Sequence, residues 1–532
     1  MGALTSKSFP FELRGWDIEK FEGLDPTDGF LSNTKVYISK NQIVQIEPDY
    51  NVYNFNSWLT DKSRSFFDSM CYKSGQYDLK LEHNYWGETF SSILKTLYII
   101  DYCNNNYQTE NDNFFTVVYD YLSFETNAIL QLISAKVPFI KLKKTDNLKL
   151  NNDLEKNFQL NNAEKNNISK STLTLLVSTN SRYEGYYLNL NLRQRSLKGN
   201  FKCLMLGSLI NLTFPVSFLG SNTKLLKSIV EGNNVLCQDF KFSKNPLVIF
   251  NANIIKRNDG KSIVSMLEKL LKLKELKKTF TSSSFLSSCV GFNNSLMFKT
   301  MSALNTKDFY NYKGIFFLNT KTEGSSHLKK IVSLKMLKKI SKQHKIFKKT
   351  TIFDQSYKYN NNLLLSKENL SKYTYIPCST FYENEETFIN TEGFIKRTTK
   401  LIYKKQSKSN WQILRKLSKL IKNKVSFLNF SNASLISYNS KELNSFKNYI
   451  NFHYYASQTL TNLSFYLTIK TKKVLFSNKH NIFKQQTNKV YSTKIKYWLD
   501  DFFTGGRDEY SQNSSILSNC SKILRKESST FF

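Results

Sequence analysis

Four short apolar runs, each followed by a polar or helix-length stretch, constrain the fold of this chain more than any other feature. They are LTLLV (residues 173–177), KCLMLG (202–207), PLVIF (246–250) and GIFFL (314–318). Continuous apolar strands that alternate with helical stretches are typical of a parallel sheet covered on both faces. The sequence therefore predicts an α/β fold.

The amino-terminal part has a different pattern. TKVYIS and IVQIEP, separated by KNQ, predict a hairpin in a small β domain that ends near residue 75. After it, residues 84–100 have apolar side chains at helical spacing, which predicts a helix that faces the core. These side chains are Trp86, Phe90, Ile93, Leu94 and Leu97.

The formal net charge of +34, from 76 Lys and Arg against 42 Asp and Glu, would suit an acidic partner such as nucleic acid. However, the excess is spread over lysine runs, and the abundant Lys, Asn, Phe, Tyr and Ile are residues that an AT-rich genome favours. A solvated surface is therefore the preferred interpretation, with no nucleic-acid partner. No apolar run approaches the roughly 18 residues that span a bilayer, and no signal peptide or presequence pattern opens the chain.

Metal and nucleophile motifs are missing from the sequence. Its seven cysteines are widely spaced, with no pair closer than Cys71 and Cys103, so neither an iron–sulfur cluster nor a zinc site is expected. Five single histidines form no H-E-x-x-H pattern. The sequence therefore predicts no catalytic, cofactor-binding or metal-binding residue in this chain.

Two turns could bind an anion at a helix start. Residues 178–185 (STNSRYEG) follow an apolar strand, but Ser, Thr and Asn there are explained by helix capping, and a partner contact or an ion pair is favoured for Arg182 and Glu184. At residues 258–260 (NDG), a helix cap beside a structural Arg257 is likewise favoured over an anion site. The acidic strip 383–386 (ENEE) could do acid–base chemistry, but a surface or interface role is favoured.

Several blocks together resemble one family. GALTSKSFPFELRGW near the start, LLVSTNSRYEGYYLNLNLRQR with LKGNFKCLMLG, NPLVIFNANIIKRNDG, and IPCSTFYENEETFINTEG with NWQILRKLS occur in the family's order. They are similar to the carboxyl-terminal two-thirds of the largest peripheral-arm subunit of respiratory complex I. The final LDDFFTGGRDEYSQNSSILSNCS resembles the tail of mitochondrial and related bacterial members, apart from an apparent insertion at 505–510.

The resemblance implies Rossmann-like parallel-sheet domains of the molybdopterin oxidoreductase type, without a bound cofactor. Leu31 stands where the family usually has Gly, and Phe394 where it has Arg, and the chain holds only 18 glycines with which to build pterin-binding loops. In family members the equivalent of GALTSK follows a Cys-Pro-Val with the last ligand of an iron–sulfur cluster. Met1 occupies that place here, so the clusters are expected in a separate amino-terminal fragment encoded by a split gene.

The resemblance thus predicts a non-catalytic structural subunit of mitochondrial complex I, NADH:ubiquinone oxidoreductase, on the matrix side of the inner membrane. Two alternatives stay open, a molybdopterin-dependent oxidoreductase and an organellar RNA-binding protein. The expected partners are the iron–sulfur fragment and other matrix-arm subunits, with no direct membrane span, and the gene is expected in the mitochondrion. The predicted interface with the fragment comprises Gly2, Ala3, Leu4, Thr5, Ser6, Lys7, Arg14 and Trp16.

Three regions are expected along the chain. Residues 1–75 form the small β domain, and residues 76–430 form the molybdopterin-oxidoreductase-like region, with polar insertions near 145–172 and 321–372. Residues 431–532 form an extension rich in Lys, Asn and Ser that ends in the family-like tail.

Overall fold

A computed structural model describes the ordered elements of the chain and several short segments between them. The described residues are 5, 11, 13–49, 58–70, 86–106, 114–119, 122–144, 167–243, 245–251, 254–255, 257, 259–275, 282–286, 294, 312–318, 351–355, 373–376, 379–392, 394–403, 408–425, 491–492, 494–495, 510–511 and 514–529.

The amino-terminal part contains an antiparallel sheet in the order β1-β2-β3. Its strands are β1 (Glu19–Leu24), β2 (Asn33–Ser39) and β3 (Gln42–Pro48). Lys40 and Asn41, both at positive φ, turn the chain between β2 and β3, and this geometry suits a tight hairpin. The predicted hairpin is confirmed, as part of a small antiparallel sheet.

One face of this sheet packs on residues from distant parts of the sequence. Helix α2 (Asp61–Ser65) follows the sheet, and α21 (Ser515–Ser529) reaches it from the carboxyl-terminal end of the chain. The Asp68 carboxylate anchors the start of α21 by accepting from the backbone N of Ile516 at 3.0 Å. The shared apolar core includes Val36, Ile38, Ile43, Ile46, Phe66, Phe381, Tyr382, Phe388 and Leu517.

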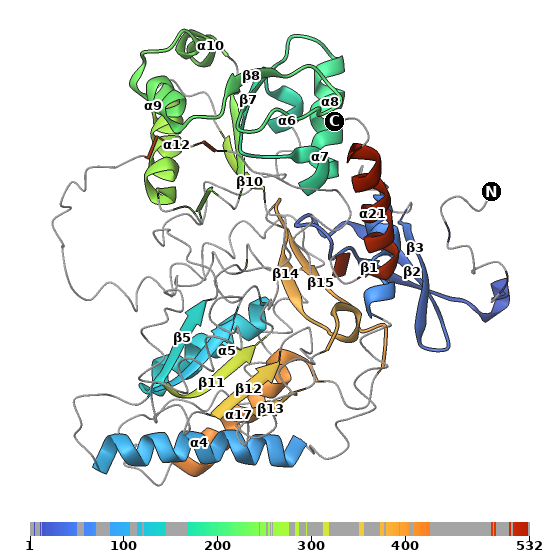
Figure 1. The fold of residues 1–532 in the computed structure, drawn as a ribbon, viewed down its shortest axis with the longest axis vertical. Helices are drawn as coiled ribbons and strands as arrows, with labels where there is room; N and C mark the ends of the chain where they lie inside the picture. The colour runs from blue at the N-terminus through green and yellow to red at the C-terminus, as the bar shows by residue number, and fades with distance from the viewer. Residues whose placement is uncertain are drawn as a thin grey trace. The chain divides into compact units, whose positions relative to one another are not determined.

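A five-stranded parallel sheet, called the β6 sheet here, follows in the order β10-β9-β6-β7-β8 (Figure 1). The chain builds β6, β7 and β8 in one direction and then returns to add β9 and β10 on the other side of β6. The strand order therefore reverses between β6 and β9, as in doubly wound folds. The strands are β6 (Leu173–Val177), β7 (Lys202–Leu206), β8 (Ser217–Gly220), β9 (Leu247–Asn251) and β10 (Ser282–Leu286).

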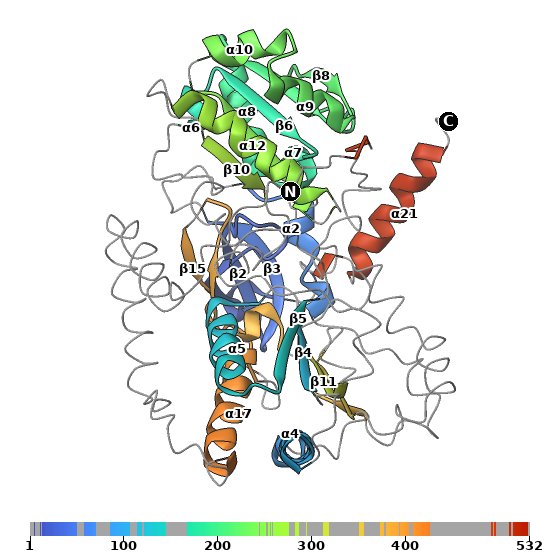
Figure 2. The ribbon, with the colours of Figure 1, turned by 90° about the vertical axis from the view of Figure 1, so that its left-hand side faces the viewer.

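Helices cover both faces of the β6 sheet (Figure 2). On one face Leu176, Met205 and Ile249 pack with Leu188 and Leu192 of α8 (Tyr186–Leu197). The other face packs on α9 (Thr223–Glu231) and α12 (Gly260–Glu275). Residues of β6 alternate between the two cores, because successive side chains of a strand point to opposite faces. The remaining helices of this part are α6 (Asn167–Lys170), α7 (Ser181–Glu184) and α10 (Leu236–Phe242).

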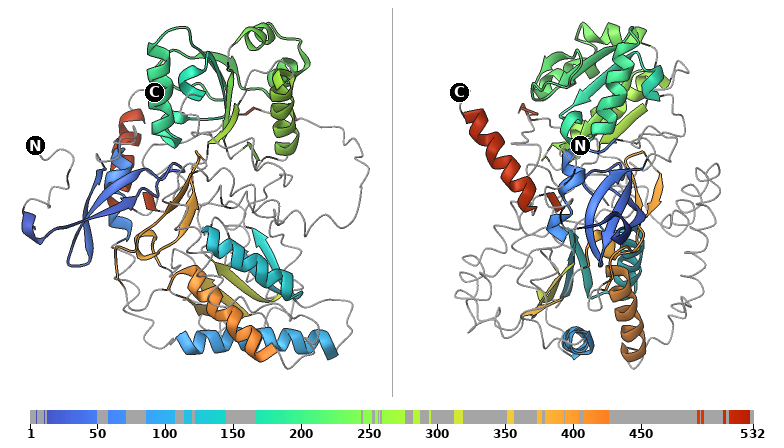
Figure 3. Two further views of the ribbon diagram at one scale, coloured as in Figure 1. Left: turned by 180° about the vertical axis from the view of Figure 1, so that it is seen from behind. Right: turned by 90° about the vertical axis from the view of Figure 1, so that its right-hand side faces the viewer.

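A second parallel sheet, the β11 sheet, has the order β13-β12-β11-β4-β5 and reverses between β4 and β11. The β6 sheet is inserted in sequence between β5 and β11. Helix α5 (Phe124–Lys136) contacts β5, and α4 (Trp86–Asn106) contacts β11 and β4 (Figure 3). The strands are β4 (Phe114–Tyr119), β5 (Ile140–Lys144), β11 (Tyr312–Leu318), β12 (Thr351–Gln355) and β13 (Tyr373–Tyr375).

The remaining elements are short, apart from one longer helix. They are η2 (Gly15–Asp17), η6 (Phe381–Glu383), the antiparallel pair β14 (Thr387–Ile389) and β15 (Ile395–Arg397), and α17 (Asn410–Val425). None of the helices in the described ranges combines the length and the apolarity that a membrane span requires.

The predicted α/β class with parallel sheets is confirmed. Three of the four apolar runs form β6, β7 and β9, whereas the fourth forms β11 in the other sheet. The domain boundaries stay a prediction; β12 falls inside the range 321–372, and most of the ranges 145–172 and 431–532 lies outside the described residues.

Candidate functional site

The turn after β6 is the first candidate, because ligands of open α/β sheets bind at the carboxyl ends of the strands. Ser178 takes a positive φ of 53°, and its backbone N donates to the Leu206 carbonyl at 2.7 Å. Asn180 then caps α7, since its side-chain oxygen accepts from the backbone N of Tyr183 at 3.2 Å. The predicted helix cap is confirmed.

Glu184 places a buried carboxylate at the point where the strand order reverses. Its Oε2 atom accepts from the backbone N of Asn180 at 3.2 Å and from Nδ2 of Asn251, the last residue of β9. Glu184 is 4% exposed and Asn251 is fully buried. The carboxyl ends of β6 and β9 are therefore joined by side chains of the protein itself.

Neighbouring polar groups in this turn also bond within the chain. Ser181 Oγ donates to Asn189 Oδ1 at 2.9 Å, and Asn189 Nδ2 donates to the Leu212 carbonyl at 3.1 Å. Arg182 is exposed and donates from Nη1 to the Asn211 carbonyl at 3.3 Å. Arg182 and Glu184, which lie two residues apart in the sequence, thus form hydrogen bonds with different residues.

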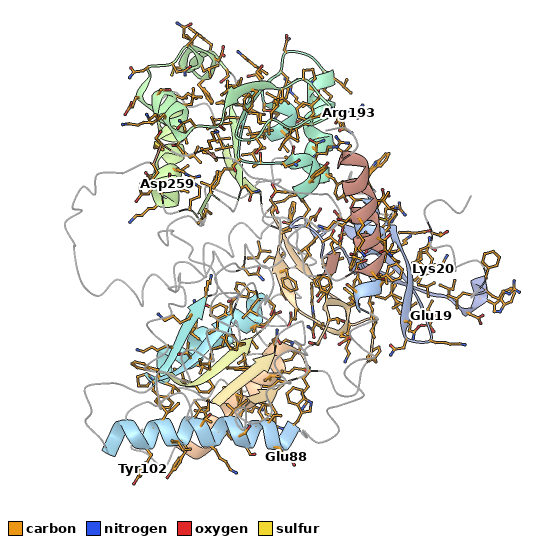
Figure 4. The ribbon with its side chains drawn as sticks, in the orientation of Figure 1. Glu19, Lys20, Glu88, Tyr102, Arg193 and Asp259 are labelled. Carbon is orange, nitrogen blue, oxygen red and sulfur yellow. The ribbon has the colours of Figure 1, made fainter. Side chains whose placement is uncertain are left out.

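The second predicted turn lies between β9 and α12. Arg257 forms a two-point ion pair with Asp259, from Nε to Oδ1 at 2.8 Å and from Nη2 to Oδ2 at 3.0 Å. Asp259 is 3% exposed and directly precedes Gly260, the first residue of α12 (Figure 4). The interpretation of Arg257 as a structural arginine beside a helix start is confirmed.

A short segment from the carboxyl-terminal region covers part of the same sheet edge. Arg257 Nη1 donates to the Lys494 carbonyl at 3.2 Å, and the backbone N of Ile495 donates to the Ser221 carbonyl at 2.6 Å. Ile495 is 1% exposed and belongs to the core of the β6 sheet. A Cβ atom on Gly207, which has a φ of +148°, would meet the Ile495 carbonyl oxygen at 3.2 Å, so the segment lies close to the end of β7.

The acidic strip differs from its prediction. A surface or interface role was favoured, but Glu383, Asn384 and Glu386 are 5%, 7% and 6% exposed. Only Glu385 reaches solvent, where it pairs with Arg397. Burial and the nearby Glu125 carboxylate raise the pKa of Glu386 to about 8. The surface interpretation was wrong because these residues fold back into the core as part of a capping turn and the start of β14.

A buried group of ionisable residues, called the charge cluster here, was missed by the sequence reasoning. It consists of Asp25, Asp28, Lys62, Glu392 and Lys396. The two aspartates lie in the loop between β1 and β2, Lys62 lies in α2, and the other two lie in the β14–β15 hairpin. Lys62 Nζ donates to the Thr27 carbonyl at 3.4 Å, and Lys396 Nζ donates to Asn33 Oδ1 at 3.0 Å.

Burial shifts the protonation equilibria of this cluster. Desolvation, followed by the neighbouring Asp25, raises the pKa of Asp28 to about 8, against the opposing effects of Lys62 and Lys396. Desolvation also raises the pKa of Asp25 and lowers that of Lys396 to about 8. Strongly perturbed ionisable groups in one place mark a candidate functional site.

Leu31 adds a strained backbone beside this cluster. It takes a φ of +51° while fully buried, and its carbonyl accepts from Lys396 Nζ. The left-handed region disfavours a bulky residue, which explains why glycine is usual at this position in the family that the sequence resembles. The unusual Leu31 was the one sequence signal that pointed to this place.

The predicted interface residues are described only in part. Trp16 in η2 is 83% exposed, and Phe11 nearby is 90% exposed. Arg14 is exposed and Thr5 half-buried, while Gly2, Ala3, Leu4, Ser6 and Lys7 lie outside the described residues.

Within the part of the chain that the structure describes, no three His, Cys, Asp or Glu residues are placed to hold a metal ion. All five histidines lie outside that part. Cys203, Cys237 and Cys520 are free thiols, and burial raises the pKa of Cys203 to about 12.

Two parallel sheets with a reversal in strand order, one inserted in sequence into the other, and a small antiparallel sheet define a mixed α/β protein of the doubly wound type. The sequence profile of the molybdopterin oxidoreductase family matches residues 86–420, and the chain belongs to this family.

Similarity to known proteins extends beyond that match. The chain is 27% identical over 461 residues to the 75 kDa subunit of NADH-ubiquinone oxidoreductase from Reclinomonas americana, covering 81% of this chain and 61% of that protein. It is 23% identical over 291 residues to a subunit of NADH-quinone oxidoreductase from Rickettsia prowazekii, covering 51% of this chain and 40% of that protein. The chain thus spans less than two-thirds of these relatives.

Proposed function

We propose that this chain is a structural subunit of respiratory complex I, on the matrix arm of the mitochondrial enzyme. The observation that carries this proposal is the similarity to the 75 kDa subunit over 81% of the chain. On this proposal, electrons pass from NADH to ubiquinone through cofactors held by other subunits, and no residue of this chain takes part in the chemistry.

The carboxyl edge of the β6 sheet supports a role without a pterin. Glu184 and Asn251 bond each other between β6 and β9, and Ile495 lies over the end of β7. A pterin bound at this edge would have to displace these contacts, and the buried Glu184 carboxylate repels any anionic group. The residues present therefore do not fit the cofactor.

Native-gel separation of solubilised mitochondria, followed by mass spectrometry, tests the assignment. Comigration of this chain with flavin-bearing and iron–sulfur subunits of complex I is the expected result. Migration with ribosomal proteins in an RNase-sensitive particle would instead support the RNA-binding alternative. If the chain migrated alone, without other proteins, this would contradict membership of the complex.

The partner proposal is more specific. The relative from Reclinomonas contains polypeptide that this chain does not match, and we propose that iron–sulfur polypeptide of the complex packs against this chain. The proposed contact surface is the ribbon made of η2 and the first four residues of β1, Glu19, Lys20, Phe21 and Glu22, which are all exposed. Figure 4 labels Glu19 and Lys20 in this ribbon. Trp16 and Phe21, which are 83% and 38% exposed, give this ribbon two aromatic side chains that a partner could cover.

The ribbon can be tested by substitution. Trp16→Ala should weaken recovery of iron–sulfur subunits with the tagged chain by about 30-fold, the effect of losing one aromatic anchor. Phe242→Ala, at a 77% exposed aromatic residue in α10, is the matched control and should leave recovery unchanged. Equal recovery with both variants would remove the ribbon as the interface.

A further inference from the structure

The loop between β1 and β2 holds two carboxyl groups inside the protein. Asp25 Oδ1 accepts from the backbone N of Thr27 at 2.9 Å and from its Oγ1 at 2.8 Å, and Asp28 Oδ1 accepts from the backbone N of Phe30 at 3.0 Å. The Oδ2 atoms of both aspartates are buried and have no hydrogen-bond partner within the described residues. Asp25 is 1% exposed and Asp28 is 7% exposed.

The charges of the cluster do not balance. With all groups ionised, Asp25, Asp28 and Glu392 carry three negative charges, and Lys62 and Lys396 carry two positive charges, which leaves one excess negative charge. An uncompensated buried charge is strongly unfavourable, and protonation is the usual way to remove it.

Three tyrosines lie near carboxyl groups of the cluster. Tyr186 lies near both aspartates, Tyr382 lies near Asp25, and Tyr187 lies near Glu392. Desolvation raises the pKa of each of these phenols above its usual range, so they stay neutral at physiological pH. They contribute no positive charge, and the excess negative charge of the cluster remains.

We propose that Asp25 and Asp28 form a proton-binding site, which holds one proton on their otherwise unpaired Oδ2 atoms at neutral pH. The bound proton cancels the excess negative charge and turns one carboxylate into an O–H donor. This site is independent of membership of complex I.

The site joins separate parts of the sequence, so proton binding is coupled to their packing. Tyr186 OH at the start of α8 donates to Ser32 Oγ at 3.1 Å, and Asn390 Nδ2 of the hairpin donates to the Phe30 carbonyl at 3.2 Å. Ser63 in α2 lies 3.1 Å from the Thr27 hydroxyl. Loss of the proton places two like charges in the loop that makes all these contacts, which loosens them.

Infrared spectroscopy of the full chain labelled with [4-¹³C]aspartate tests the proposal. The label shifts aspartate bands away from glutamate bands, so Glu386 does not interfere. We expect a protonated aspartic acid band near pH 6 that disappears as the pH rises through about 8. In Asp28→Asn, which keeps the Oδ1 acceptor for Phe30, the band should be lost, while Asp239→Asn, at a partly exposed carboxylate, should keep it.

A spectrum with only ionised aspartates near pH 6 in the unsubstituted chain would overturn the proposal. So would a protonated band that persists unchanged in Asp28→Asn and Asp25→Asn. Because the labelled unsubstituted chain gives a decisive result by itself, the test does not depend on the folding of either variant.

Discussion

The carboxyl edge of the β6 sheet and the charge cluster both bury polar side chains, but they do so in different ways. At the sheet edge, the Glu184 carboxylate accepts from Asn180 and Asn251. In the cluster, three carboxyl groups, those of Asp25, Asp28 and Glu392, are buried with only two ammonium groups, those of Lys62 and Lys396. The first region uses the protein's own groups where a family member would hold a ligand, whereas the second requires something more, and a proton is the smallest ligand that suffices.

The comparison shows that the usual ligand-binding position of a fold and the most strongly perturbed ionisable groups can lie in different parts of one protein. The sheet edge has the topology of a binding site, since the strand order reverses there. The perturbed ionisable groups lie elsewhere, among the β1–β2 loop, α2 and the β14–β15 hairpin. Fold alone therefore gives a poor guide to which residues remain chemically unusual.

The largest expected effect is a dependence of stability on pH. Burial raises the pKa of Asp28 and of Glu386 to about 8, from 3.8 and 4.5. At pH values between the ordinary pKa values near 4 and the raised values near 8, the folded chain therefore binds more protons than the unfolded chain. The free energy of unfolding thus falls as the pH rises from about 5 through 8. Lys396, with a pKa lowered from 10.5 to about 8, has the opposite effect above pH 8. Hydrogen exchange of β2 amides across this range measures the change, and constant protection would contradict it.

Removing a cation from the cluster should come next in size. Lys396→Met leaves Asp28 and Glu392 with less compensation and removes the donor to the Leu31 carbonyl. Loss of one member of a buried charged group costs about 3–5 kcal/mol, which pulse proteolysis in urea can measure. Lys202→Met, from an exposed pair with Asp239, should cost less than about 1 kcal/mol. Equal losses of stability in Lys396→Met and Lys202→Met would show that the charge cluster depends on its lysine no more than an exposed ion pair does.

The covering segment at the sheet edge should contribute somewhat less. Ile495→Ala removes a side chain that is 1% exposed in the β6 core, and such a truncation costs about 2–4 kcal/mol. Cleavage by protease near residues 491–495 should become faster. Ile516→Ala, at a 41% exposed isoleucine of α21, serves as the control. Unchanged cleavage in both variants would contradict the contact of Ile495 with this core.

The smallest effect is expected from the hydrogen bond between β6 and β9. Asn251→Leu leaves Glu184 Oε2 without its side-chain donor, and loss of one partner of a buried pair costs about 1–3 kcal/mol. Gln194→Leu changes an exposed residue of α8 and should have little effect. Chemical denaturation of the two variants, with a signal from the β6 sheet, compares their free energies of unfolding. If Asn251→Leu left this free energy unchanged, the hydrogen bond would not stabilise the sheet edge.

Strand identity could be read from the sequence where buried runs are continuous. LTLLV became β6 with all five residues buried, and the turn residues after it were correctly assigned to a helix cap. The division into two sheets could not be read, because β4 and β11 are neighbours in space while the whole β6 sheet separates them in sequence. Local periodicity carries no information on such pairings.

The charge cluster could not be predicted from the sequence for a related reason. Asp25, Lys62 and Lys396 look like ordinary turn or surface residues, and only tertiary packing buries them together. The acidic strip misled in the same way, since a run of charged residues usually indicates solvent exposure. Leu31 was noticed as unusual, but its positive φ and its bond to Lys396 appear only in the fold.

The most direct test of the central claim is elemental analysis of the assembly purified through a tag on this chain. The claim is that the chain is a structural subunit of an iron–sulfur electron-transfer complex. Its own residues, and no pterin cofactor, occupy the carboxyl edge of the β6 sheet. It predicts iron in several-fold excess over the chain, with flavin and no stoichiometric molybdenum. Molybdenum or a pterin at one equivalent per chain would contradict it and would make the β6 sheet edge a working cofactor site.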